Sequence, residues 1–265
     1  MRYIIDNDLH IHTNLSICSN DEKQTPLALL DYAKQQKLKT ICVTDHYWDS
    51  ALKCNTAYNW WYEKQNFDHI SQNLPLPSCD GIRFLFGCEA DLDSDNLIGV
   101  PPERYDDFDF IIVSTTHFHH MTGEKWTDAT NKQLANLWVE RMNVILSSTL
   151  PFGKVGVAHP ACSLINRKSR ADYLETLDLI NNDDLYDIFR EASKKNLSIE
   201  INADMKFEDS EAESVLRMFR IAKECTCKFY LGSDAHSVGG FSNAKNVFDK
   251  VIDLLELTED DKFII

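Results

Sequence analysis

The stretch DLHIHT, residues 8–13, ends the first predicted strand and sets two histidines among apolar residues. In an extended strand, side chains two positions apart point to the same face, so Asp8, His10 and His12 are expected to share one face. Leu9 and Ile11 would then occupy the opposite face. Imidazoles and carboxylates gathered on one face can bind a metal ion, so the stretch predicts one edge of a metal site.

Strand-like and helix-like segments alternate along the whole chain, a pattern typical of a parallel sheet with helical connections. Seven strands are predicted, at residues 4–12, 40–44, 83–88, 108–114, 154–158, 197–201 and 228–231. The predicted helices are residues 25–36, 131–147, 184–194, 210–224 and 242–255. No linker rich in Pro, Gly or Ser interrupts this pattern, so residues 1–265 are expected to form a single α/β domain.

Side chains able to bind a metal follow every predicted strand. They are His10 and His12, Asp45 and His46, Glu89, His117, His159, Glu200 and Asn202, and Asp234 and His236. In barrels of alternating strands and helices, functional groups gather at the C-terminal ends of the strands. The metal site is therefore expected at the C-terminal rim of a barrel.

Imidazoles and carboxylates without an obligatory thiolate suit zinc, manganese or iron. This chain supplies more ligands than one ion can use, and a carboxylate such as Glu89 can bridge two ions. Sites of that kind activate a water molecule and hold the oxygens of a phosphoryl group. The residues therefore predict metal-assisted hydrolysis, most naturally of a phosphate ester.

The chain has 27 Lys plus Arg against 42 Asp plus Glu, a formal net charge of −15. This balance argues against a broad nucleic-acid surface, although bound cations would create local positive charge for an anionic substrate. No apolar run is long enough to cross a membrane, and residues 1–8 lack the apolar core of a signal peptide. The protein is expected in the cytoplasm, with most of its eight cysteines as free thiols.

The motifs DLHIHT, VTDH, GCEAD, STTH, AHP and GSDAHS occur in that order across nearly the whole chain. Together they resemble the polymerase and histidinol phosphatase (PHP) family, and most closely its free-standing, histidinol-phosphatase-type members. The resemblance implies a distorted seven-stranded (β/α)7 TIM-like barrel that holds two or three divalent ions. It also implies hydrolysis of a small phosphate monoester, with L-histidinol phosphate as the first candidate.

Carried onto this chain, the resemblance implies three groups of metal ligands. The first ion would be held by His10, His12, Glu89 and Asp234, the second by Glu89, His117 and His159, and the third by His46 and His236. Cys18 stands where related phosphatases often place a third-site histidine. A thiolate there would favour zinc or iron. Alternatively, Asp21 reaches the site or the site is empty.

Further residues are expected to serve the ions or the substrate. Asp45 would orient His46 or a neighbouring ligand. His236 or Asp8 is the candidate acid for protonation of the leaving group. Arg167 and Arg170 follow the fifth strand and would bind phosphate. His119 is the alternative to His117 as a ligand, or lies near the substrate, and His120 is expected to face solvent or the substrate.

Three other functions fit parts of the same pattern. A PHP-type enzyme acting on nucleotides or oligonucleotides would have the same metal ligands. An amidohydrolase-type barrel also begins with a His-x-His strand, but it has eight strands and often a lysine after the fourth, where this chain has HFHH. A non-catalytic metal-binding module would bind ions without turnover.

Overall fold

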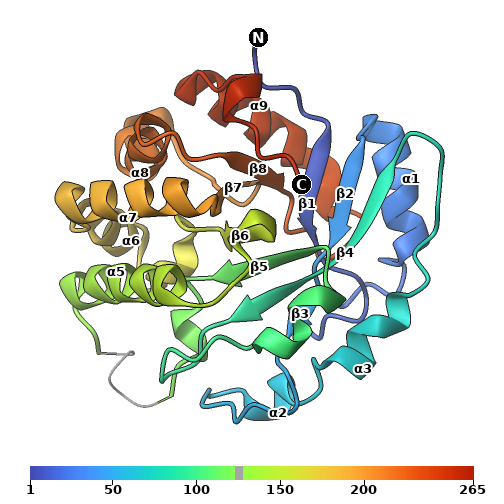
Figure 1. The fold of residues 1–265 in the computed structure, drawn as a ribbon. Coiled ribbons are helices and arrows are strands. Elements are labelled where there is room, and N and C mark those ends of the chain that lie inside the picture. Colours follow the sequence, from blue (N-terminus) through green and yellow to red (C-terminus); the bar gives the residue numbers. More distant parts are fainter. Residues whose placement is uncertain (123–127) are drawn as a thin grey trace.

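The computed structural model describes residues 1–122 and 128–265, in which a central parallel sheet is surrounded by helices (Figure 1). The sheet runs in the order β1-β2-β4-β5-β6-β7-β8, and the two-residue β3 also pairs with β4. The strands are β1 (Asn7–Ile11), β2 (Thr40–Val43), β3 (His46–Tyr47), β4 (Arg83–Asp91), β5 (Phe110–Ser114), β6 (Val155–Ala158), β7 (Ser198–Asn202) and β8 (Phe229–Gly232). The seven predicted strands and the α/β barrel are confirmed.

Helices follow most of the strands. They are α1 (Pro26–Gln36), α2 (Asn59–Tyr62), α3 (Phe67–Ile70), α5 (Asn131–Ser147), α6 (Arg170–Asp178), α7 (Asn182–Lys195), α8 (Ala212–Glu224) and α9 (Ala244–Leu255). The sequence predicted five of these to within two residues at each end. Helix α6 was missed because NRKSR resembles a loop, although the Ser169 side chain caps its first turn. None of the helices in the described part of the chain is long and apolar enough to cross a membrane.

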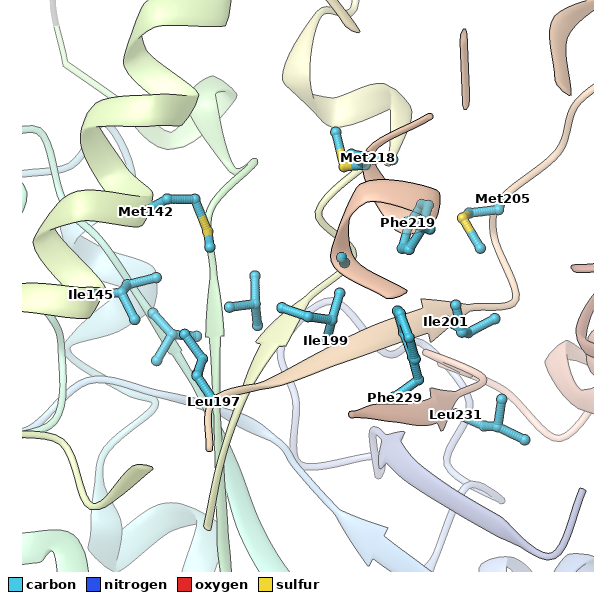
Figure 2. Close-up of a cluster of buried hydrophobic side chains, with 14 of the residues drawn as sticks. Met142, Ile145, Leu197, Ile199, Ile201, Met205, Met218, Phe219, Phe229 and Leu231 are labelled. Carbon is cyan, nitrogen blue, oxygen red and sulfur yellow. The ribbon is translucent and has the colours of Figure 1, made fainter. Parts of the chain in front are cut away.

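Alternation along the strands separates the packing face from the inner face of the barrel. In Figure 2, Ile199 and Ile201 of β7 and Phe229 and Leu231 of β8 lie with side chains of α5 and α8 in one buried apolar cluster. Because side chains alternate along β7, Glu200 points to the opposite, inner face. The outer face of the strands thus packs against the helices, and inward residues such as Glu200 at the C-terminal ends of the strands are available for the site.

The barrel closes between β1 and β8 through side chains as well as backbone. Asn7 Oδ1 accepts from Leu231 N (3.2 Å) and Asp8 Oδ1 accepts from Ser233 N (2.9 Å). Further toward the rim, Asp234 N donates to His10 O (2.8 Å). These bonds stand where a closed barrel would have a regular hydrogen-bonded ladder between β1 and β8. The barrel is therefore distorted at this seam.

The prediction that Asp8 shares a face with His10 and His12 is wrong. The register of β1 against β2 shifts between Asp8 and Ile11, and such an irregularity breaks the alternation of side chains. The second carboxylate oxygen of Asp8 accepts from the Tyr32 hydroxyl of α1 (3.1 Å). The predicted role of Asp8 as a general acid is not supported, because one of its oxygens bonds to Ser233 where the barrel closes and the other bonds to Tyr32 of α1.

The C-terminal segment closes the base of the barrel. Phe263 N donates to Phe229 O (2.8 Å), and the Phe263 ring joins an interior cluster that includes Leu9, Phe110 and Tyr230. The ring centroids of Phe263 and Phe110 are 5.6 Å apart. Phe263 is therefore part of the core.

We predict that Phe263→Ala lowers the free energy of unfolding by about 3 kcal/mol, because it leaves a cavity among buried rings. Chemical denaturation measures this change. Ile264→Ala is the matched control, since Ile264 is 81% exposed and its loss should cost less than about 0.5 kcal/mol. Equal stabilities of the two variants would contradict a sealing role for Phe263.

Candidate metal centre

Four acceptor atoms of His10, His12, Glu89 and Asp234 converge at the C-terminal rim. The two Nε2 atoms of His10 and His12 lie 3.1 Å apart, and Glu89 Oε2 is 3.6 and 3.4 Å from them. Asp234 Oδ1 lies 3.4 Å from His10 Nε2 and 3.2 Å from His12 Nε2. Donors about 2.0–2.1 Å from a tetrahedral ion are roughly 3.3–3.4 Å apart, so these atoms have the spacing of a zinc ligand set.

Both histidines are anchored through Nδ1, which leaves Nε2 as the atom with the lone pair. His10 Nδ1 donates to Glu200 Oε1 (2.8 Å), and His12 Nδ1 donates to Ser16 Oγ (2.8 Å). Ser16 Oγ in turn donates to Asp45 Oδ1 (2.7 Å). Asp45 therefore lies behind His12, which it contacts through Ser16. Such outer contacts fix the tautomer and the ring orientation of metal-binding histidines.

The other oxygen of Glu89 faces a second group of side chains. Glu89 Oε1 lies 3.0 Å from His159 Nε2 and 4.0 Å from His117 Nε2. His159 Nδ1 is 2.9 Å from Thr116 Oγ1, so this ring is also anchored on its far side. The two carboxylate oxygens of Glu89 thus point to different groups of imidazoles, which is the arrangement of a bridging carboxylate.

A third group contains a thiol. Donor atoms of His12, Cys18, His46 and His236 all lie within 4.8 Å of one another. His46 Nδ1 is buried 3.0 Å from Glu89 Oε2, yet it makes no hydrogen bond within the described part of the chain. Asp21, the alternative ligand, instead accepts from Val238 N (3.0 Å) and Lys23 N (3.0 Å). The structure therefore places Cys18, and not Asp21, in this group.

Two candidate ligands have unusual backbone conformations. His159 has φ of 29° and Asp234 has φ of 52°, in the left-handed region that side chains other than glycine seldom occupy. Such conformations cost of order 1–3 kcal/mol and are concentrated at functional sites. Their presence here indicates that the barrel holds both side chains in place at some cost to stability.

The buried charges of the site favour a cation. Burial raises the pKa of the Glu89 carboxyl, but the neighbouring His46 and His10 outweigh it and hold the pKa well below its usual range. Burial likewise lowers the pKa of His10, yet Glu200, Asp234 and Glu89 together raise it well above its usual value. The ionised carboxylates of the centre therefore stabilise positive charge on the histidines. A bound metal ion can supply that positive charge in place of the protons on the imidazole rings.

A further buried cluster was missed in the sequence. Asp91 Oδ1 accepts from His117 Nδ1 (2.5 Å), and Asp91 Oδ2 accepts from the Tyr62 hydroxyl (2.6 Å). His120 Nδ1 lies 2.6 Å from the same hydroxyl. His120 is buried, so the expectation that it faces solvent is wrong. Asp91 could have been found, because the two-residue period that turns Glu89 inward also turns Asp91 inward.

A pocket of about 560 Å³ opens beside Asp234 and is lined by Arg167, Arg170, Tyr173, Asp204 and Lys206, among others. Arg170 does not offer its full fork to a ligand, because it donates to Glu211 Oε1 (2.9 Å) and Oε2 (2.6 Å). Arg167 is exposed, and no ion pair to it is found among the described residues. Of the two arginines that line the pocket, Arg167 is therefore the one without an acidic partner among the described residues.

His119 lies outside the metal-ligand groups found in the described residues. Its ring centroid is 5.6 Å from that of His117, and its buried Nδ1 has no hydrogen-bond partner there. Burial is the main cause that lowers the pKa of His119 to about 3, so its ring is neutral. Of the two alternatives, His117 is the one whose ring meets Glu89.

The chain resembles several known proteins along most of its length. The "Probable phosphatase" of Caldicellulosiruptor saccharolyticus is 22% identical over 88% of this chain and 80% of its own length. A "Probable phosphatase" of Photobacterium profundum is 27% identical over 95% of this chain and 87% of its own length.

A solved structure and a family model are also similar to this chain. The crystal structure of histidinol phosphate phosphatase from Lactococcus lactis, complexed with zinc, L-histidinol and phosphate, matches with a TM-score of 0.60 and 16% identity. The match covers 98% of this chain and 99% of that one, and shows a shared fold. The family model described as PHP domain matches residues 8–204. The chain belongs to the PHP family.

Proposed function

We propose that this protein is a metal-dependent phosphatase that hydrolyses a small phosphate monoester. The observation that carries the proposal is Glu89, whose two buried oxygens face separate groups of imidazoles on a PHP barrel. The two relatives named as phosphatases support the same reaction class. We also propose that residues 1–265 form one domain, since the sheet begins at Asn7 and residues near the C-terminus close its base.

We assign two or three divalent ions, zinc, manganese or iron, to the three groups of side chains. His10, His12, Glu89 and Asp234 would hold the first, and Glu89, His117 and His159 the second. Cys18, His46 and His236 would hold the third, beside His12. When bound, such ions supply an activated water and neutralise the oxygens of the phosphate. The missing lysine after the fourth predicted strand and the family membership favour this assignment over an amidohydrolase.

The substrate would occupy the pocket beside Asp234. Arg167 would bind the phosphate through its planar fork, and His119, whose pKa Arg167 helps to lower, would lie near the substrate. The side chain of His236 is 35% exposed. When the third group of side chains holds no ion, the His236 ring would be able to deliver a proton to the leaving group. L-histidinol phosphate is the first candidate substrate, because the similar Lactococcus structure contains L-histidinol and phosphate.

We predict that the protein reconstituted with zinc or manganese releases phosphate from L-histidinol phosphate, and that Glu89→Gln lowers turnover by at least about 100-fold. An amide cannot replace the charge or both acceptor oxygens of the bridging carboxylate. Phosphate release is measured against a chelated sample.

Glu191→Gln is the control for this substitution, because Glu191 pairs with Lys194 and Lys195 on the surface of α7, away from the metal-ligand groups. Release from nucleoside monophosphates but not from L-histidinol phosphate would redirect the substrate assignment. Ion binding with no release from any phosphate ester would instead favour a non-catalytic module.

We predict that Arg167→Ala lowers kcat/KM for the phosphate ester by about 10- to 100-fold, the value of one or two charge-assisted hydrogen bonds. Steady-state kinetics measure the change. Arg190→Ala is the control, since Arg190 lies on the exposed side of α7 and pairs with Asp187. An unchanged kcat/KM would show that Arg167 does not contact the phosphate.

We predict that the cobalt-substituted protein shows a thiolate-to-cobalt charge-transfer band that disappears in Cys18→Ser, because a serine hydroxyl is a hard and weak ligand. The near-ultraviolet absorption spectrum measures the band. Cys54→Ser is the control, since Cys54 is half-buried and lies outside the metal-ligand groups of the described residues. Persistence of the band in Cys18→Ser would contradict a thiolate ligand at the third site.

A further inference from the structure

Asp91, His117 and His120 form a cluster whose composition is that of a metal site. One donor atom from each lies within 4.8 Å of the others, and all three side chains are buried. The phenol of Tyr62, however, lies among them. Its hydroxyl is 2.6 Å from Asp91 Oδ2 and 2.6 Å from His120 Nδ1, so a protein group already bonds to two of the three residues.

Proton bookkeeping fixes the direction of each bond in this cluster. A tyrosine hydroxyl has one hydrogen to donate, and an ionised carboxylate can only accept. Asp91 therefore receives the hydroxyl hydrogen, and His120 Nδ1 must donate to the Tyr62 oxygen. Asp91 also receives the Nδ1 hydrogen of His117. The result is a continuous path in which both oxygens of one buried carboxylate are occupied.

This path sets the orientation of His117. With Nδ1 bound to Asp91 at 2.5 Å, the lone pair of His117 is at Nε2, 4.0 Å from Glu89 Oε1. Asp91 Oδ2 also has His46 Nδ1 as a possible partner, 3.6 Å away. The Tyr62 hydroxyl thus keeps Asp91 turned toward His117 and leaves His46 available to the neighbouring group.

We propose that Tyr62, Asp91 and His120 are positioning residues that hold His117 ready to bind the second ion, and that their cluster is not an ion site itself. This inference rests on the proposed function, since it concerns a ligand of the proposed second ion. The three residues come from different parts of the chain: Tyr62 ends α2, Asp91 ends β4, and His120 ends a short 3₁₀ helix at Phe118–His120. These hydrogen bonds therefore connect the segment after β5, which contains His120, to the metal centre.

The test is Tyr62→Phe, which removes only the hydroxyl. We expect its second ion to bind about 10-fold more weakly, the lower end of the effect of losing an outer partner of a metal ligand, because Tyr62 acts on His117 through Asp91. The first ion should bind as in the wild type. Calorimetric titration of the metal-free protein with zinc, and metal content after dialysis, measure this without any assay of activity.

Tyr32→Phe is the matched control, because it also removes a hydroxyl that donates to a buried carboxylate, at 3.1 Å from Asp8. Asp8 belongs to none of the metal-ligand groups found in the described residues, so Tyr32→Phe should leave the affinities of both ions unchanged. A general loss of packing or stability would affect the two variants alike. Only a specific role predicts that they differ.

Asp91→Asn is the second variant, and it should reproduce the loss because an amide oxygen and nitrogen cannot accept both hydrogens. Two results would overturn the proposal: wild-type zinc affinity in both Tyr62→Phe and Asp91→Asn, or an additional ion bound in Tyr62→Phe, which would make the cluster an ion site blocked by the phenol. If the wild type itself binds no zinc, the proposed function fails as well, and that failure is visible before any variant is compared.

Discussion

The carboxylate of Glu89 is the group on which the rest of the site depends. Five imidazoles lie within 4.0 Å of its oxygens, those of His10, His12, His46, His117 and His159. A buried, ionised carboxylate without compensation costs several kcal/mol, and converging lone pairs on nitrogen add repulsion. Positive charge among these atoms, from protons or from metal ions, is therefore a condition for the observed packing, and the surrounding structure holds the ligands where ions can provide that charge.

The fold meets this condition by anchoring the far side of the ligand rings. Glu200 binds His10 and also accepts from the backbone of His159, so one inward residue of β7 connects two ligands. A Cβ atom at Gly232 would lie 1.8 Å from Glu200 Oε1 and 2.6 Å from His10 Cβ. Only glycine, which has no Cβ atom, avoids these clashes. The closure of the barrel between β1 and β8 thus brings backbone and metal ligands together without space for a Cβ atom.

The sequence predicted those parts of the site that follow from local periodicity and order. Strands ending in His10, His12, Glu89, His117, His159 and Asp234 could be recognised because each polar ending followed an apolar run, and parallel strands bring such endings to one rim. The position of Asp8 could not be predicted, because a shift in strand register leaves no local signature in DLHIHT. The contacts of Tyr62 with Asp91 and with His120 join residues 29 and 58 positions apart, so only the folded chain shows them.

The acidic composition also limits how an anionic substrate can be bound. Around the pocket, Glu211 holds Arg170, and Asp204 lies 3.8 Å from Lys206, so two of the three cationic side chains that line it have acidic partners. Arg167 then supplies one cation against a net charge of −15 for the whole chain. Since low-dielectric clefts are governed by their nearest charges, ions at the rim would supply most of the attraction for a phosphate. The same ions would then determine both the binding of the substrate and its hydrolysis.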